Sequence, residues 1–297
     1  MSTPAPLFTI VIPTYNRAHL IGKTIQSILE QDFTNFEVLI VDDGSKDNTE
    51  GVIARFTDLR IQYYKKQNAE RGAARNFGAA RALGKYINFF DSDDLMYTNH
   101  LLAASTLIEK ENLPEFFHLG YDYKLEDGTL LKEINDFTDG TKEEIFFDNK
   151  LSCNGVFIRK DIATEFPFEE NRVLASSEDW ALWIKLLCRF KFVYSNEITS
   201  SVINHDQRSL RTIPAEKVAP RDIFFIELMK QDAVVTKNYG RGFYRFIAER
   251  YTFFMLAYAE QGKKSEVLRW AYRAFMVYPL ILTSKRFLAS IKNVILK

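Results

Sequence analysis

The stretch KYINFFDSDDL, residues 85 to 95, decides the fold, because a short apolar run ends there in a cluster of carboxylates. Residues 86–90 are apolar enough to predict a strand buried on both faces. A second run of this kind, residues 36–41, leads into the acidic turn VDDGS at residues 41–45. Since open α/β folds bind ligands at the carboxyl edge of the sheet, we expect both acidic turns at one edge. Crowded carboxylates repel one another unless a divalent cation or a hydrogen-bonding ligand lies among them, which predicts a metal and nucleotide site.

Strands alternate with helices in the first part of the chain, which predicts a parallel sheet with right-handed crossovers. Asn16 stands where it would cap the first of these helices. After residue 115 the pattern becomes antiparallel, with aromatic-rich strands around a turn at Asp127-Gly128, and from residue 215 it is helical. We therefore expect an α/β protein, a mixed sheet flanked by helices with a C-terminal helical extension. The predicted strands are 8–12, 36–41, 60–65, 86–90 and 191–204, and the predicted helices are 18–30, 47–56, 72–83, 99–112 and 179–190.

Four motifs in this order resemble the large family 2 of glycosyltransferases, which are inverting enzymes with a GT-A fold. They are VIPTYNR at residues 11–17, VDDGSKDNT at 41–49, FFDSDD at 89–94 and SEDW at 177–180. The resemblance covers roughly the first 210 residues. It implies a Rossmann-like GT-A glycosyltransferase domain at residues 1–212, with a nucleotide-binding half at 1–97 and an acceptor-binding half at 98–212, followed by a helical extension at 213–297.

The donor site is predicted from the turns that follow the strands. The turn Pro13 to Arg17 ends a strand and opens a helix, so its backbone N–H groups should be free for a nucleotide, although it could also be a helix cap alone. The resemblance gives base binding to Asp43, leaving Asp42 to order the turn. It also places the segment 70–80 beside the nucleotide, where an arginine would contact phosphate or be merely solvated. The predicted nucleotide-sugar contacts are Pro13, Thr14, Tyr15, Arg17, Asp43, Arg71, Arg75, Asn76, Asp91 and Ser92.

Asp91 and Asp93 form a DxD pair that can converge on one hard cation, either Mn²⁺ or Mg²⁺. The resemblance makes Asp93 the direct ligand and Asp91 a ribose or metal contact, whereas Asp94 is expected to cap a helix. His205 would add a third metal or phosphate contact, although a lone histidine is more often structural. A solvated acidic loop is the alternative for the whole turn.

The acidic pair Glu178-Asp179 opens a predicted helix. Capping and the helix dipole alone would explain it. The resemblance instead makes Asp179 the catalytic base, with Glu178 contacting the acceptor or supporting the loop and Trp180 on the acceptor side. Processive members of the family carry a Gln-x-x-Arg-Trp element, which this chain lacks after Gln207. The departure predicts addition of a single sugar, and Arg208 and Arg211 would help to hold the pyrophosphate.

Charge is distributed unevenly along the chain. The 297 residues have a formal net charge of zero, yet residues 241–297 carry 11 Lys+Arg against 3 Asp+Glu. This basic, aromatic-rich tail could lie on an anionic membrane surface or pack as a helical bundle with a solvated basic face. No groove-reading motif accompanies the charge, so nucleic-acid binding is not expected.

The compartment is predicted from the cysteines and from the absence of export and spanning signals. Cys153 and Cys188 have no metal-ligand spacing, and neither a signal peptide nor a spanning apolar run is present. We therefore expect a reduced, cytoplasmic setting. Within it, the chain could be free or bound as a peripheral protein at the inner face of the membrane.

Together these features predict an inverting, metal-dependent glycosyltransferase. It would move one sugar from a nucleotide-diphosphate donor, UDP-linked by expectation, to a hydroxyl of a growing glycan or a lipid-linked glycan. Sugar-nucleotide synthesis would need a glycine-rich loop after the first strand, and residues 13–17 contain no glycine. The other alternative is a non-catalytic, membrane-recruited scaffold or sugar-binding protein that keeps the fold.

Overall fold

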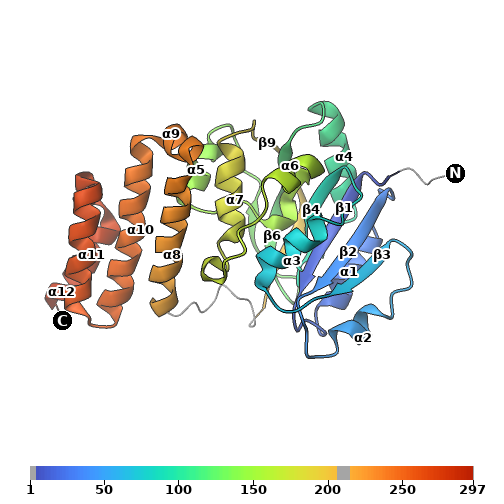
Figure 1. Cartoon of the computed structure of the whole chain (residues 1–297), viewed down its shortest axis with the longest axis horizontal. Helices are drawn as coiled ribbons and strands as arrows, with labels where there is room; N and C mark the ends of the chain where they lie inside the picture. Colours follow the sequence, from blue (N-terminus) through green and yellow to red (C-terminus); the bar gives the residue numbers. More distant parts are fainter. Residues whose placement is uncertain (1–4, 206–214, 297) are drawn as a thin grey trace. The chain divides into compact units, whose positions relative to one another are not determined.

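The chain divides into two compact units, residues 1–208 and residues 209–297. The computed structural model describes residues 5–205 and 215–296 (Figure 1). The division falls just before the boundary predicted at residues 212 and 213. Predicted contacts Arg208 and Arg211, and the segment after Gln207, lie outside the described residues.

One mixed sheet forms the centre of the N-terminal unit. In the described residues it has nine strands in the order β3-β2-β1-β4-β8-β6-β9-β5, with β7 paired to β6. The pairs β3–β2, β2–β1 and β1–β4 are parallel, which confirms the parallel first half. The strands are β1 Phe8–Thr14, β2 Phe36–Asp42, β3 Ile61–Lys65, β4 Tyr86–Phe89, β5 Leu95–Met96, β6 Phe116–Leu125, β7 Leu130–Ile134, β8 Val156–Arg159 and β9 Val193–Asn204.

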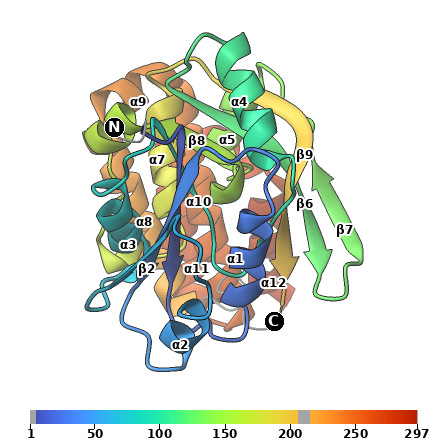
Figure 2. The same cartoon turned by 90° about the vertical axis from the view of Figure 1, so that its right-hand side faces the viewer.

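The second half of the sheet is mainly antiparallel, as predicted. Strand β8 runs antiparallel to both β4 and β6. Strands β6 and β7 form an antiparallel hairpin, joined by the turn that contains Asp127 and Gly128 (Figure 2). The exception is β6 with β9, a parallel pair whose register runs from Phe117 with Val193 to Leu125 with Asn204.

Burial explains why the first strands read as continuous apolar runs. Every residue of β1 and of β2 is buried, as expected for parallel strands covered on both faces. In register, Thr14 pairs with Asp42 and Phe8 with Tyr86. The carboxyl ends of β1 and β2 therefore meet at one edge, and the acidic turns after β2 and β4 open there.

Helices cover the sheet. On α1, Ile21, Ile25 and Ile28 are buried in the main core. On α3, Gly78 packs so closely on β1 that an added Cβ would lie 2.4 Å from Val11. The helices of this unit are α1 Ile21–Leu29, α2 Thr49–Ile53, α3 Glu70–Ala79, α4 His100–Lys110, α5 Thr141–Phe147, α6 Lys160–Glu165 and α7 Glu178–Leu187, with the 3₁₀ turns η1 Cys153–Gly155 and η2 Arg172–Leu174.

The predicted cap of the first helix is wrong. Helix α1 begins at Ile21 rather than at residue 18, and Leu20 precedes it. Asn16 instead takes a left-handed backbone conformation, φ 53°, and its Oδ1 accepts a hydrogen bond from the Lys46 N–H at 2.8 Å. Asparagine tolerates this conformation because its short amide bonds the nearby backbone. It thus ties the loop after β1 to the loop after β2.

The C-terminal unit is helical, as the periodicity predicted, and has a core of its own. Phe254, Met255 and Trp270 are among the buried residues of that core. Among the described residues, no helix is both long enough and apolar enough to cross a bilayer. The elements are α8 Ala215–Gln231, α9 Ala233–Tyr239, α10 Arg241–Glu260, α11 Lys264–Val277, the 3₁₀ turn η3 Pro279–Thr283 and α12 Lys285–Leu296.

Candidate active site

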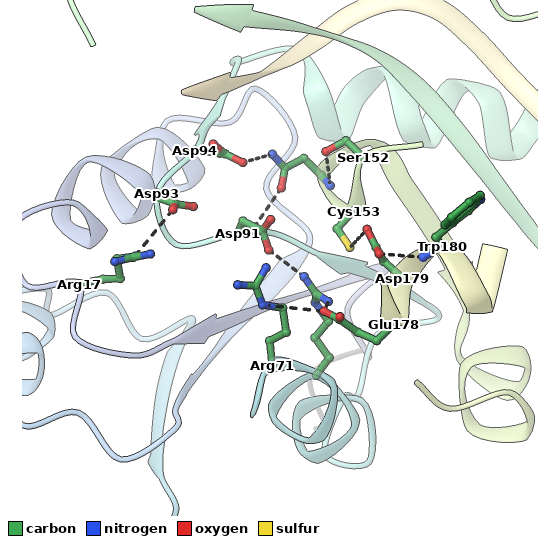
Figure 3. Close-up of polar contacts among 12 residues, drawn as sticks. Arg17, Arg71, Asp91, Asp93, Asp94, Ser152, Cys153, Glu178, Asp179 and Trp180 are labelled. Carbon is green, nitrogen blue, oxygen red and sulfur yellow. Dashed lines mark hydrogen bonds and ion pairs between the residues drawn. The ribbon is translucent and has the colours of Figure 1, made fainter. Parts of the chain in front are cut away.

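The acidic turn after β4 gathers three carboxylates. Asp91, Asp93 and Asp94 each offer an oxygen, and these oxygens lie within 4.8 Å of one another (Figure 3). The side chains of Asp91 and Asp93 keep 26% and 14% of their surface exposed. Two of the three carboxylates are therefore open to a ligand at the carboxyl edge of the sheet.

Asp94 has a different role from the helix cap predicted for it. It is completely buried, and the chain continues from it into strand β5 rather than a helix. Its Oδ2 accepts from Asn154 Nδ2 at 2.7 Å, and its Oδ1 accepts from the Ile203 N–H at 2.8 Å. Asp94 therefore fastens the acidic turn to η1 and to the end of β9, and the capping prediction is wrong.

Asp93 brings together residues from three distant segments. Its Oδ2 lies 3.0 Å from His205 Nε2, at the end of β9, and 3.7 Å from Arg17 Nε, in the loop after β1. The predicted metal contact His205 is thus placed beside the predicted ligand Asp93. Arg17, a predicted nucleotide contact, forms an ion pair with the same Asp93 carboxylate.

The donor set at this turn fits a divalent cation. Carboxylate oxygens are the ligands that Mg²⁺ prefers, and an added imidazole nitrogen is also acceptable to Mn²⁺. Asp91 and Asp93 supply the oxygens, with the His205 nitrogen 3.0 Å from Asp93. Over the described ranges 5–205 and 215–296, the acidic turn is the one group of three such side chains close enough to hold an ion.

The first turn does not present the free backbone N–H groups predicted for it. The N–H groups of Asn16, Arg17 and Ala18 donate to side chains of the β2–α2 loop and the first residue of α2, namely Ser45 Oγ, Thr49 Oγ1 and Asp47 Oδ2, at 2.8 to 3.1 Å. That part of the prediction is wrong, because the loop after β2 satisfies these donors.

Other predicted residues of the first turn lie at the sheet edge. Pro13 pairs in register with Val41, and Tyr15 is exposed. Thr14 is buried, and its Oγ1 has no hydrogen-bond partner within the described chain. Ser92, in the acidic turn, is buried as well.

The two acids of VDDGS are both engaged. Asp42 orders the turn by accepting from the Ser45 N–H and the Tyr63 hydroxyl, each at 2.7 Å. Asp43 is buried, forms an ion pair with Lys66 at 2.6 Å, and accepts from the N–H of Ala69 at 2.9 Å and of Glu70 at 2.8 Å. Asp43 therefore anchors the start of α3, and its contact with the base stays a prediction.

Arg75 is the link between the acidic turn and the start of α7. Its guanidinium is buried and donates through Nη1 to Glu178 Oε1 and through Nη2 to Asp91 Oδ1, both at 2.9 Å. Arg71 lies on the exposed side of the same Glu178, with its Nε 3.8 Å from Oε1. The sequence left Arg75 open between a phosphate contact and a solvated side chain. In the structure its guanidinium bonds two carboxylates, and a phosphate contact stays a prediction.

Asn76 joins α3 to the segment that precedes η2. Its Nδ2 donates to the Phe168 carbonyl at 2.9 Å and to Glu170 Oε1 at 2.8 Å, while its Oδ1 accepts from the Phe168 N–H at 2.9 Å. These bonds hold the segment before η2 against α3, and the contact of Asn76 with a nucleotide stays a prediction.

Asp179 lies in the first turn of α7 with hydrogen-bond donors on both oxygens. Oδ1 accepts from the Trp180 N–H at 2.7 Å, and Oδ2 lies 4.0 Å from Cys153 Sγ (Figure 3). Oδ2 also lies 3.2 Å from Asn149 Nδ2. Burial, reinforced by the negative charge of Glu178 and opposed by Arg75, raises the pKa of Asp179 from 3.8 to about 6. A carboxylate with a pKa near the working pH suits a general base. Sequence reasoning missed Asn149, for which no pattern gave a signal, and considered Cys153 only for its lack of metal-ligand spacing.

The predicted acceptor contacts Glu178 and Trp180 are both buried. Glu178 is held by Arg75, so it takes the loop-supporting role that the sequence left open. The Trp180 indole N–H donates to the Ile145 carbonyl at 2.6 Å, which packs α7 against α5. Neither side chain offers an open face to an acceptor in this structure.

Replacing Arg75 with lysine is expected to lower the free energy of unfolding of the N-terminal unit by about 1.5–3 kcal/mol. An ammonium group lacks the planar fork that reaches Asp91 and Glu178 at once, so one buried charged hydrogen bond is lost. Urea unfolding followed by circular dichroism measures the change. Arg71→Lys is the matched control, because its exposed pair should contribute less than about 1 kcal/mol. Equal effects of the two substitutions would contradict the bridging role of Arg75.

Comparisons with known proteins agree with this fold. A model of the family described as glycosyl transferase family 2 matches residues 9–144. The chain is 30% identical over 191 residues to the putative teichuronic acid biosynthesis glycosyltransferase TuaG of Bacillus subtilis, covering 63% of this chain and 74% of that protein. The chain belongs to glycosyltransferase family 2.

Further relatives extend the comparison. The chain is 29% identical to an Escherichia coli protein named UDP-Glc:alpha-D-GlcNAc-diphosphoundecaprenol beta-1,3-glucosyltransferase WfgD, over 61% of this chain and 70% of that protein. It is 35% identical to an uncharacterized glycosyltransferase of Rickettsia bellii, over 61% of this chain. That match spans only 26% of the Rickettsia protein, and two further Rickettsia matches span 30% of theirs.

Solved structures show the same fold. Staphylococcus aureus TarS, residues 1–349 in complex with UDP-GlcNAc, superposes with a TM-score of 0.70 at 20% identity, covering 97% of this chain and 88% of that one. A mannosyltransferase of Pyrobaculum calidifontis, in complex with GDP-Man and Mn²⁺, gives a TM-score of 0.59 at 16% identity, covering 99% and 87%. The α/β fold of this chain is the GT-A fold.

Proposed function

We propose that this protein is an inverting, metal-dependent glycosyltransferase that moves a single sugar from a UDP-linked donor to a hydroxyl of a lipid-linked glycan. The observation that carries the proposal is the chain of contacts from Asp93 and Asp91 through Arg75 to the start of α7. It places a cation-compatible acidic turn and a carboxylate with a raised pKa in one site. Family membership and the nucleotide-sugar complex of TarS support a nucleotide-sugar donor.

The donor would lie across the carboxyl edge of the parallel strands, in the half formed by residues 1–97. Asp91 and Asp93, with His205, would hold a divalent cation, which when bound would stabilise the charge of the departing diphosphate. Arg17 is positioned on the same side to meet phosphate, since guanidinium suits oxyanions. The Mn²⁺ in the mannosyltransferase complex supports the metal part of the proposal.

Asp179 would act on the acceptor, which the half formed by residues 98–212 would bind. An inverting transfer needs one base to take the proton of the attacking hydroxyl. Asn149 and Cys153 contact Oδ2 of Asp179, and the Trp180 N–H holds Oδ1, so the carboxylate has a fixed direction. Glu178 forms an ion pair with Arg75 at 2.9 Å, and Asp179 is the acid of this pair that we assign as the base.

A lipid-linked acceptor is proposed from the names of the relatives and from the tail. WfgD is named for an acceptor on diphosphoundecaprenol, and TuaG for biosynthesis of a wall polysaccharide, teichuronic acid. The basic extension, residues 213–297, would keep a cytoplasmic protein near the inner face of the membrane.

The test is a panel of UDP-, GDP- and dTDP-sugars incubated with the full chain, Mn²⁺ or Mg²⁺, and membrane lipid extract carrying polyprenyl-linked glycans. Release of one nucleoside diphosphate with matching sugar incorporation is the expected result. Donor binding without turnover for every sugar and extract would favour the alternative, a sugar-binding or scaffold protein that keeps the fold.

We expect kcat/KM to fall about tenfold for each pH unit below about pH 6. Asp179 must be deprotonated to accept the hydroxyl proton, and burial with the charge of Glu178 raises its pKa to about 6. The profile is measured at saturating metal with the donor found in the panel. A profile that stays level between about pH 5 and 7 would contradict the assignment of Asp179 as the base.

A further inference from the structure

Helix α11 carries two apolar faces, of which its own unit packs only one. Val267, Trp270, Ala271 and Ala274 are buried in the C-terminal core. The other face is an exposed stripe: Leu268 is 57% exposed, Tyr272 65%, Phe275 39% and Met276 61%. The spacings from residue 268 to 272, from 272 to 275 and from 275 to 276 are four, three and one positions, which place all four residues on one side of the helix.

Exposed apolar side chains also follow directly after α11. Only Tyr278 separates α11 from η3, where Leu280 and Leu282 are 66% and 43% exposed. Single exposed apolar residues are ordinary, but a run of six large ones over two adjoining elements is typical of an interaction surface. We call these six residues, 268, 272, 275, 276, 280 and 282, the α11–η3 surface.

Basic side chains border this surface. Arg269 and Arg273 are exposed along one side of the stripe, and Lys264 is exposed on the other. Arg273 lies over the Trp270 ring at 4.7 Å, and Arg269 has an acidic neighbour, Glu266, at 3.5 Å. With 11 Lys+Arg against 3 Asp+Glu in residues 241–297, the apolar stripe stands in a positive field.

We propose that the α11–η3 surface binds the surface of a bilayer that contains anionic phospholipid. A helix in the plane of a membrane buries its apolar side chains just below the headgroups, while Lys and Arg extend their long stems to the phosphates. Both features are present here on one helix face. A second copy of the chain fits less well, because a two-fold contact through this face would bring the two basic borders together.

This inference extends the proposed function by naming the surface that meets the membrane of the lipid-linked acceptor, and it is tested separately from catalysis. The full chain is sedimented with phosphatidylcholine vesicles containing about a third phosphatidylglycerol, and with pure phosphatidylcholine vesicles. Binding to the anionic vesicles alone, weakened by added salt, is expected.

Two full-length double variants divide the apolar and the charged contributions. Leu268→Gln with Met276→Gln and Arg269→Gln with Arg273→Gln should each weaken vesicle binding about tenfold or more. The matched controls are Leu59→Gln, a fully exposed leucine, and Lys23→Gln, an exposed lysine, both in the N-terminal unit. The controls should bind as the parent chain does, and circular dichroism confirms that all variants are folded.

Three outcomes would overturn the inference: unchanged vesicle binding by both double variants, equal binding to neutral vesicles, or a dimer in sedimentation equilibrium that Leu268→Gln with Met276→Gln abolishes. Release of nucleoside diphosphate is measured on the same variants without vesicles and should match the parent. Vesicle binding that depends on this surface in a chain that transfers no sugar would support the inference while the proposed function failed.

Discussion

Asp179→Asn is expected to lower sugar transfer about 10²- to 10⁴-fold, the usual range for loss of a general base. Asparagine keeps the size of the side chain, so the start of α7 should be preserved. Its Oδ1 can still accept from the Trp180 N–H, but its amide cannot take the proton of an acceptor hydroxyl. Transfer is measured as sugar incorporation at saturating donor, and donor affinity by calorimetry.

Stability provides the control for this substitution. The folded-state pKa of Asp179 is raised from 3.8 to about 6, so the unfolded chain binds fewer protons between these values and stability falls as the pH rises through them. An asparagine at this position would not carry the charge that causes this loss, so the variant should unfold at least as high in temperature as the parent at pH 7. Near-parental turnover in such a folded variant would exclude Asp179 and make Glu178, despite its ion pair with Arg75, the acid to test next.

The parallel half of the sheet could be predicted because its sequence signal is local. Each of its inner strands is an apolar run that ends in a polar turn, and parallel strands place such ends at one edge. The prediction that Asp91 and Asp93 lie there needed no knowledge of distant residues. The same reasoning found the antiparallel hairpin at residues 116–134 from its turn, but it gave no sign that β9 would pair with β6 in parallel.

Contacts between distant residues explain what the sequence could not show. Arg75 meets Glu178 across 103 positions, and Asp94 meets Ile203 across 109. The residues near Arg75 in the sequence do not show whether its guanidinium pairs with two buried carboxylates or contacts a phosphate. Both roles need an arginine at this position of α3. Likewise, Asp93 and Asp94 are adjacent aspartates in the sequence, and only their distant partners distinguish them: His205 for Asp93, and Asn154 and Ile203 for Asp94.

The prediction of free backbone N–H groups in the turn at residues 13–17 was wrong for a related reason. The backbone N–H donors of this turn could be counted from the sequence. Their acceptors, however, are side chains of residues 45–49, about thirty positions further along the chain. A free helix N-terminus and one satisfied by a neighbouring loop have the same local pattern. Such a site can be assigned only once the two loops are seen together.

Asp93→Asn is expected to reduce transfer at least about 100-fold at a Mn²⁺ concentration that saturates the parent chain. If Asp93 is a ligand of the proposed cation, losing its carboxylate should cost more than the 10- to 100-fold typical of residues one layer further out. The variant keeps a hydrogen-bond acceptor for His205 and a polar neighbour for Arg17, so the loop after β1 and the end of β9 should stay in place. Transfer is assayed against Mn²⁺ concentration, and free Mn²⁺ is followed independently by electron paramagnetic resonance.

Asp127→Asn is the matched control, because it makes the same change in an exposed turn, where the carboxylate accepts from the Thr129 N–H. It should leave both Mn²⁺ binding and transfer at parental levels. In the parent chain, excess chelator should stop transfer, and added Mn²⁺ should restore it. Full transfer in excess chelator would remove the metal from the mechanism, and Arg17 and His205 would then be the groups left to meet the diphosphate charge.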